Sequence, residues 1–276
     1  MNSTLRRTIA VVEVVLVAFA IVPVLAWAIL RLFPAAAGWH KQAVFYVVAV
    51  AVPFLLAFAR RQKLVEYAIV FRPFRYHLNI TLTCIVPFLL ADLMFLVVDY
   101  KRSWIGALVL AVTNIVLLLV LAWLLRRKPS AREVGIVGAG MILVPVLAQA
   151  APSIAGQALV AFFSNALFVG FGEEILYRGY MQSRLNEEFG RPFKFFGVSC
   201  GWGAIITSVL FGLMHIGVQR WIIGLDTQVT LAWGVWTIFA GLVFSLVREK
   251  TGSILAPALL HGLPEAVGAV VGVFMG

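Results

Sequence analysis

Charged residues are scarce in this chain. Only 12% of its 276 residues are Asp, Glu, Lys or Arg, whereas 62% are hydrophobic and the mean hydropathy is +1.00. Soluble domains carry roughly a quarter charged residues, so the composition excludes an ordinary soluble domain. Apolar runs of about 18 residues or more are typical of transmembrane helices, and such runs fill most of the sequence. The sequence therefore predicts an all-α fold, a polytopic transmembrane helical bundle.

Cysteine and sequence repeats are also lacking. The two cysteines, Cys84 and Cys200, show no C-x-x-C spacing, which argues against a disulfide framework or a zinc knuckle. The H-E-x-x-H motif of soluble zinc proteases is absent. No internal repeat of fixed period is visible, which argues against a transporter built from inverted halves. The candidates for chemistry are therefore the polar side chains within the apolar segments.

The sequence predicts a bundle of about eight or nine spans, and the nine candidate spans are 8–30, 41–59, 78–98, 103–125, 134–151, 157–177, 198–217, 229–247 and 253–274. The basic residues are distributed unevenly between these nine spans. With the N-terminus inside, the inner segments hold 17 of the 22 basic residues and the outer segments hold 5. This is the positive-inside pattern, so we interpret the net charge of +10 as a topology signal rather than as nucleic-acid binding. We expect an integral protein of a bacterial or archaeal cell membrane, in contact with membrane lipid, with a cytoplasmic N-terminus.

The two parts of the chain differ in composition. Residues 1–133 hold conventional apolar spans, which we interpret as an N-terminal transmembrane scaffold. Residues 134–276 carry Gly, Ser, Thr and His inside the spans. Small residues let helices approach closely, and hydroxyl groups can form hydrogen bonds between helices. The second part is therefore predicted to be a tightly packed polar core that holds the functional site.

Ionisable residues inside the predicted spans are the candidates for function. A charge at the centre of a bilayer costs about 2.5–3.5 kcal/mol on insertion scales, so such residues normally face protein or water. The candidates are Glu13, Asp92, Glu173, Glu174, His215, His261 and Glu265. The sequence assigns no role to Glu13 or Asp92.

The stretch FGEEILYRGY holds two adjacent glutamates and an arginine. Glu174 and Arg178 are spaced i,i+4 and can form an ion pair. Glu173 points about 100° away around the helix, where a partly desolvated carboxylate can take a proton from water. The alternative is that both glutamates reach the inner membrane interface together with Arg178.

Three spans together supply a set of groups suited to hydrolysis. His261 and Glu265 are spaced i,i+4 on one helix, and His215 lies on another. A carboxylate can act as a base, an imidazole can orient water, and a further polar pair can stabilise an oxyanion. A divalent metal such as zinc, bound by Glu173, His215, His261 and Glu265, is an alternative way to activate water.

Three segments resemble the CAAX prenyl protease and bacteriocin-processing family (CPBP, also called ABI) of intramembrane endopeptidases. The family pattern E-E-x-x-x-R appears as EEILYR at 173–178, and F-x-x-x-H appears as FGLMH at 211–215. The stretch REKTGSILAPALLH at 248–261 is similar to the approach to the third motif, H-x-x-x-(N/D). The fourth position of that motif is Glu265 here, which departs from the family pattern.

The resemblance implies a glutamate-dependent intramembrane endopeptidase that cuts a membrane-associated or lipidated peptide or protein. It implies that Glu173 is the general base and that His215 is its partner on the water. It implies that His261 helps to build the oxyanion site and that Glu174 with Arg178 supports it. An ionised Glu265 would repel an oxyanion, so it is either protonated, or it binds a metal or orients His261, or this protein has altered activity.

Two other functions remain open from the sequence. The first is a non-catalytic membrane immunity or interaction protein on the same scaffold. The second is a proton-coupled transporter in which Glu13, Asp92 and the Glu–His set form a relay.

Overall fold

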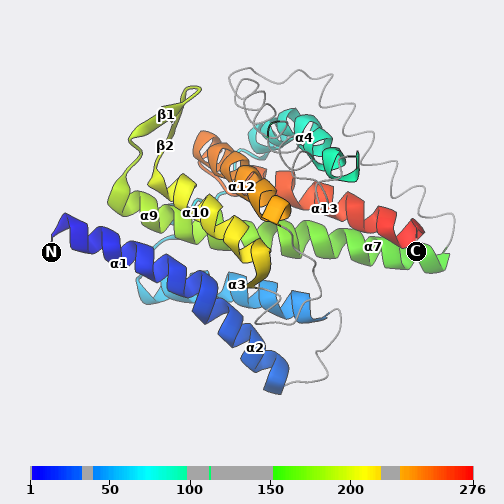
Figure 1. The fold of residues 1–276 in the computed structure, drawn as a ribbon, viewed down its shortest axis with the longest axis horizontal. Helices are drawn as coiled ribbons and strands as arrows, with labels where there is room; N and C mark the ends of the chain where they lie inside the picture. Colours follow the sequence, from blue (N-terminus) through cyan, green and yellow to red (C-terminus); the bar gives the residue numbers. More distant parts are fainter. Residues whose placement is uncertain (1, 33–39, 98–111, 113–151, 219–230, 276) are drawn as a thin grey trace.

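The computed structural model describes residues 2–32, 40–97, 112, 152–218 and 231–275 (Figure 1). Apart from Val112, the predicted spans 103–125 and 134–151 lie outside the described residues. The described part is mostly helical, which confirms the helical part of the predicted fold class.

The N-terminal part forms three helical runs. The first contains α1 (Ser3–Leu16), the π-helical segment η1 (Val17–Ile21) and α2 (Val22–Leu32). It is followed by α3 (His40–Ala59), a 3-10 turn η3 (Leu64–Tyr67) and α4 (Phe74–Val97). These elements overlap the predicted spans 8–30, 41–59 and 78–98, so the apolar patterns located these helices correctly.

One long helical run crosses the molecule from Pro152 to Phe189 (Figure 1). Its segments are α7 (Pro152–Phe163), η4 (Ser164–Phe171), α8 (Gly172–Glu174), η5 (Ile175–Met181) and α9 (Gln182–Phe189). The segments η4 and η5 have wider π-helical turns and flank the two glutamates on both sides. Such turns are rare in α-helices and often occur at functional sites.

The remaining elements pack around this run. They are α10 (Trp202–Leu213) with η6 (Met214–Val218), α12 (Leu231–Thr251) and α13 (Leu255–Met275). Helix α13 lies along α7 and η4, and α10 packs on α12 and α9. Helix α1 packs on α9, and α3 packs on α8 and η5.

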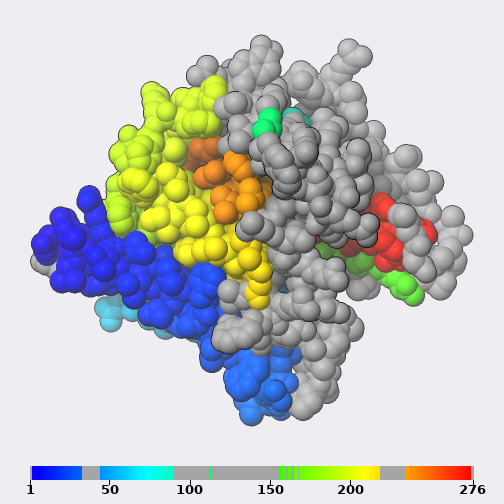
Figure 2. All heavy atoms as spheres, viewed as in Figure 1, coloured from blue at the N-terminus to red at the C-terminus, as the bar shows by residue number. Residues whose placement is uncertain are grey.

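A β-hairpin connects α9 to α10, which the sequence analysis did not predict. Strands β1 (Phe193–Phe195) and β2 (Val198–Cys200) pair antiparallel. The two loop residues have positive φ angles, 46° at Phe196 and 85° at Gly197, as a tight hairpin turn requires. The predicted span 198–217 was therefore wrong at its start, because residues 198–200 form a strand. Figure 2 shows the hairpin and α10 as adjacent surfaces beside α1.

Two described helical runs are long and apolar enough to cross a membrane, Ser3–Leu32 and Leu255–Phe274. Two shorter apolar helices occupy Val44–Ala59 and Trp202–Gly217. The number of eight or nine spans stays a prediction, as does the division into residues 1–133 and 134–276.

The long run and α13 touch through backbone at one crossing. A Cβ atom added at Gly170 would lie 2.8 Å from Gly262 Cα, and one added at Gly262 would lie 2.6 Å from the carbonyl oxygen of Ala166. Real side chains do not approach that closely, so the crossing requires glycine at both positions. This contact lies next to His261 on one helix and a few residues before the two glutamates on the other.

Candidate active site

The glutamate pair, Arg178 and His261 form one buried cluster. Glu173 and Glu174 are 2% and 0% exposed, although both carry carboxylates. Arg178 Nη1 donates to Glu174 Oε1 at 2.8 Å, which confirms the expected i,i+4 ion pair. His261 Nδ1 lies 3.1 Å from the same oxygen. Because a carboxylate oxygen only accepts hydrogen bonds, Nδ1 must carry a proton, and its N–H donates a hydrogen bond to Glu174.

The Arg178 guanidinium lies between aromatic rings. Its Cζ atom is 4.5 Å from the centroid of Phe211 and 5.2 Å from that of Phe244. Within the described residues, Arg178 Nε and Nη2 have no hydrogen-bond partner, so the ring faces compensate part of their desolvation. Gly241 leaves room for this arrangement, because a Cβ atom there would lie 2.8 Å from Arg178 Nη2. The alternative in which this arginine reaches the membrane interface is therefore wrong, since Arg178 is 0% exposed.

Only one of the two carboxylate oxygens of Glu173 accepts a hydrogen bond from the described part of the chain. Tyr46 in α3 donates its hydroxyl to Glu173 Oε1 at 3.1 Å. The other oxygen, Oε2, is buried without a hydrogen-bond partner in the described part of the chain. It lies 3.9 Å from His261 Nε2. A buried carboxylate oxygen that faces an imidazole is a group that can accept a proton.

His215 is linked to this cluster through Phe211. Its Nδ1 lies 2.8 Å from the Phe211 carbonyl oxygen, which only accepts, so Nδ1 carries a proton. In the neutral ring, Nε2 then has a free lone pair. The Phe211 ring contacts both imidazoles, with its centroid 4.6 Å from His215 and 5.7 Å from His261.

Glu265 does not join the buried cluster. It lies one turn after His261 on α13 and is exposed. Across the described ranges, no group of three or more His, Cys, Asp or Glu side chains is placed to hold a metal ion. The four-residue metal set suggested by the sequence therefore does not come together among the described residues.

Glu13 has a contact network of its own. It pairs with Arg60 Nη2 at 2.8 Å and with Arg184 Nε at 3.2 Å, and it accepts a hydrogen bond from Tyr180. These contacts connect α1 to the end of α3 and to the long helical run. Glu13 is therefore held in ion pairs away from Glu173. The side chain of Asp92 lies outside the described residues.

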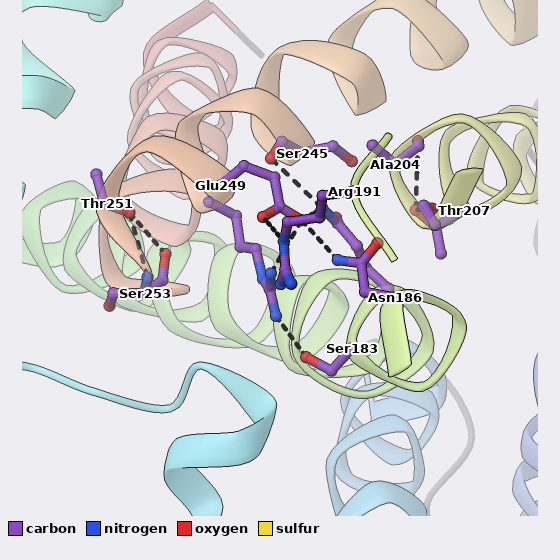
Figure 3. Close-up of polar contacts among 12 residues, drawn as sticks. Ser183, Asn186, Arg191, Ala204, Thr207, Ser245, Glu249, Thr251 and Ser253 are labelled. Carbon is purple, nitrogen blue, oxygen red and sulfur yellow. Dashed lines mark hydrogen bonds and ion pairs between the residues drawn. The ribbon is translucent and has the colours of Figure 1, made fainter. Parts of the chain in front are cut away.

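The sequence analysis missed a second polar cluster, around Glu249 (Figure 3). Glu249 Oε1 accepts from Gln182 at 2.8 Å, from Asn186 at 2.6 Å and from Arg248 at 3.0 Å. Its Oε2 accepts from Arg191 at 2.6 Å. The sequence analysis counts Arg191 only as a topology signal, and it uses Arg248 as a topology signal and as the start of the REKTGSILAPALLH stretch. The stretch REK at 248–250 places a glutamate between two basic residues, and this pattern could have predicted an ion-paired carboxylate.

Glu249 lies beyond the predicted span 229–247, and its surroundings change its acidity. Burial by itself raises the pKa of the Glu249 carboxyl. The charges of Arg248 and Arg191 and the hydrogen bonds from Arg191 and Gln182 more than offset burial, so the pKa of Glu249 lies below its usual value. This carboxylate is therefore a stable anion that joins α9, α12 and the hairpin region.

Two hollows adjoin this second cluster, with volumes of about 330 and 430 Å³. Both are lined by Glu66, Arg191 and Arg248, among other residues. Neither is lined by Glu173, His215 or His261. They are therefore separate from the buried glutamate cluster.

One string, GVSCG at 197–201, matches the literal pattern of a serine-hydrolase elbow. Ser199 lies in the middle of β2 and is exposed. That elbow needs a histidine within hydrogen-bond reach, but the described histidine contacts lead from His215 to Phe211 and from His261 to Glu174. Ser199 therefore does not belong to a nucleophile site in the described part of the chain.

The buried cluster lies within a segment that matches a known protein family. Residues 155–267 match the family model described as type II CAAX prenyl endopeptidase, Rce1-like. The match includes all four side chains of the cluster, whereas Tyr46 lies outside it. No curated protein and no solved structure matches the chain significantly. This match over residues 155–267 supports the relation to the CAAX protease family that the sequence motifs indicate.

Proposed function

We propose that this protein is an intramembrane endopeptidase that hydrolyses a peptide bond of a membrane-associated or lipidated peptide by glutamate-activated water. The observation that carries the proposal is the buried cluster of two carboxylates, one guanidinium and one imidazole within the family-matched segment. Burial of several ionisable groups costs free energy, and proteins retain such clusters mainly where they serve a function.

Glu173 is proposed as the general base. Its Oε2 has no protein partner among the described residues and is the oxygen that can take a proton from water. His215 is proposed to orient that water, because its Nδ1–H is used on Phe211 and its Nε2 lone pair can accept a hydrogen bond. The resulting hydroxide attacks the peptide carbonyl, and the proton on Glu173 passes to the leaving amine.

His261 is proposed to stabilise the oxyanion that forms on the carbonyl oxygen. Glu174 fixes its ring through Nδ1, which leaves Nε2 directed toward Glu173. Two carboxylates and one guanidinium carry a net charge of one negative, which an imidazolium at His261 would balance. In that form Nε2–H is a donor for the oxyanion. Arg178 acts indirectly, because it holds the Glu174 carboxylate that positions His261.

Glu265 is proposed not to contact the reacting atoms, because it is exposed and one helical turn from His261. The substrate is proposed to be a lipidated or membrane-bound peptide cut near the cytoplasmic face. That face follows from the many basic residues in the segment after the glutamate motif. A lipid anchor would bring the scissile bond to the depth of the cluster.

The test uses purified full-length protein in liposomes with a lipidated reporter peptide and an otherwise identical peptide without lipid. Mass spectrometry of the products identifies the bond that is cut. We expect Glu173→Gln to lower kcat/KM by about 10²- to 10⁴-fold, because general-base catalysis contributes about that much. Glu187→Gln is the matched control, because Glu187 is 57% exposed in an ion pair with Arg184. Unchanged cleavage by Glu173→Gln would exclude this mechanism.

A further inference from the structure

Tyr46 is a polar side chain from the N-terminal part that enters the buried cluster. It lies in α3, is 5% exposed, and donates its hydroxyl to Glu173 Oε1 at 3.1 Å. The two residues are 127 positions apart in the sequence, and Tyr46 is outside the matched segment 155–267. A buried tyrosine normally needs a partner for its hydroxyl, and here the partner is the proposed base.

The backbone of the long helical run leaves space for this ring. A Cβ atom added at Gly172 would lie 3.1 Å from Tyr46 Cδ1 and 3.2 Å from Tyr46 Cβ. Any larger residue at position 172 would displace the ring. Phe45 also packs on this ring, with its ring centroid 5.7 Å away in an edge-on arrangement. The phenol is thus fixed by packing before it donates to Glu173.

The hydrogen bond distinguishes the two oxygens of Glu173. Oε1 is occupied by Tyr46, whereas Oε2 faces His261 Nε2 at 3.9 Å without a hydrogen-bond partner in the described chain. Without a donor on Oε1, the last side-chain torsion of a glutamate is broad, so the orientation of the carboxylate plane would not be fixed. One fixed oxygen therefore determines where the other oxygen lies.

We propose that Tyr46 is a positioning residue: its hydroxyl holds Oε1 of Glu173 so that Oε2 is the oxygen that receives the proton. This inference rests on the proposed role of Glu173 as the base. It means that the catalytic unit includes α3, because the matched segment alone lacks the group that orients its base.

The first experiment measures kcat and KM of Tyr46→Phe on the lipidated reporter. The ring and its packing remain and only the hydroxyl is lost, so we expect kcat to fall roughly 10- to 100-fold with little change in KM. Tyr76→Phe is the matched control, because the Tyr76 hydroxyl donates at 3.3 Å to the exposed Lys250 carbonyl oxygen, outside the cluster. If Tyr46 served packing alone, Tyr46→Phe would cleave as fast as the wild-type protein, and the proposal would be wrong.

A second experiment does not depend on activity. Melting temperatures are measured for Tyr46→Phe, Glu173→Ala and the double variant. We expect Tyr46→Phe to lower the melting temperature in the wild-type background and to have no such effect beside Glu173→Ala, where the acceptor is gone. Equal shifts in both backgrounds would overturn the proposed contact.

The cleavage assays of Glu173→Gln and Tyr46→Phe together distinguish the proposed function from the proposed role of Tyr46. Cleavage that persists in Glu173→Gln contradicts the proposed function, whatever Tyr46 does. Cleavage that requires Glu173 but ignores the Tyr46 hydroxyl contradicts only the positioning role.

Discussion

Two buried carboxylates, Glu173 and Glu249, have equally buried side chains and different surroundings. Each side chain is 3% exposed. Glu249 accepts hydrogen bonds from Gln182, Asn186, Arg191 and Arg248, so both of its oxygens are occupied. Glu173 accepts one, from Tyr46, and its second oxygen has no such partner among the described residues.

The difference shows which carboxylate stabilises the fold and which is available for chemistry. A buried charge with all its hydrogen bonds satisfied holds its neighbours in one arrangement. A buried charge with one unsatisfied oxygen destabilises the fold, and proteins retain such groups mainly at functional sites. Burial alone does not identify a catalytic residue, whereas the number of satisfied oxygens separates these two glutamates.

The largest expected effect on stability comes from Glu249→Gln. The change removes the charge that Arg248 faces inside the protein, and breaking a buried ion pair is strongly destabilising. We expect a loss of about 3 kcal/mol, at the lower end of the usual range because Arg191 is 42% exposed. A thiol-reactive dye can follow the melting, because Cys84 and Cys200 are both buried and free.

The same substitution at Glu173 is the direct comparison. Glu173→Gln keeps an acceptor for Tyr46 and removes a buried charge, so we expect its melting temperature to equal or exceed that of the wild-type protein. The contrast between the two carboxylates would fail if Glu173→Gln were the less stable variant.

A smaller effect is expected at the crossing of the long run and α13. Gly262→Ala would place a methyl group 2.6 Å from the carbonyl oxygen of Ala166, so the helices must separate, at a cost of about 1–3 kcal/mol. The separation also moves His261 away from Glu174, so reporter cleavage should fall together with stability. Gly268→Ala on the same helix is the control, because a Cβ atom there meets nothing within 4 Å. Equal melting temperatures for the two variants would contradict the close contact.

The smallest expected effect is the dependence of stability on pH. The folded-state pKa of Glu249 lies below its ordinary value of 4.5, so its contribution is fully present above that pH. As the pH falls through the lowered pKa, the carboxylate is protonated and the contribution is lost. The difference in melting temperature between the wild-type protein and Glu249→Gln should therefore be constant near neutral pH and shrink below about pH 4.5. A difference that stays constant into strong acid would show that Glu249 is not the responsible group.

Much of the helical fold and part of the site could be predicted from the sequence. The position of a long apolar helix is decided mainly by one free energy, that of transferring apolar side chains out of water, so it can be predicted from composition. The pair Glu174 and Arg178 was readable from its i,i+4 spacing. His261 was grouped with them because three apolar spans carry ionisable residues and because of the family resemblance, since spacing within one helix cannot show contacts between helices.

Other features could not be read because they depend on contacts between distant segments. Tyr46 lies in an apolar run with no motif, and only the packing of α3 on α8 brings it to Glu173. The hairpin at 193–200 was missed because Phe196 is an unusual residue for a positive φ angle. The exposure of Glu265 was also unpredictable, because one turn on α13 separates buried His261 from an exposed position.

The glycine contact between the long run and α13 has a consequence for variation in this protein. His261 and Glu174 lie on two helices whose main chains touch at Gly170 and Gly262. At that crossing, the distance between the helices does not depend on the volume of any side chain. Substitutions on the outward faces of both helices, such as at Leu159 or Val271, can therefore accumulate without altering that spacing. The geometry of the buried cluster is thereby protected from sequence changes on the exposed faces of these helices.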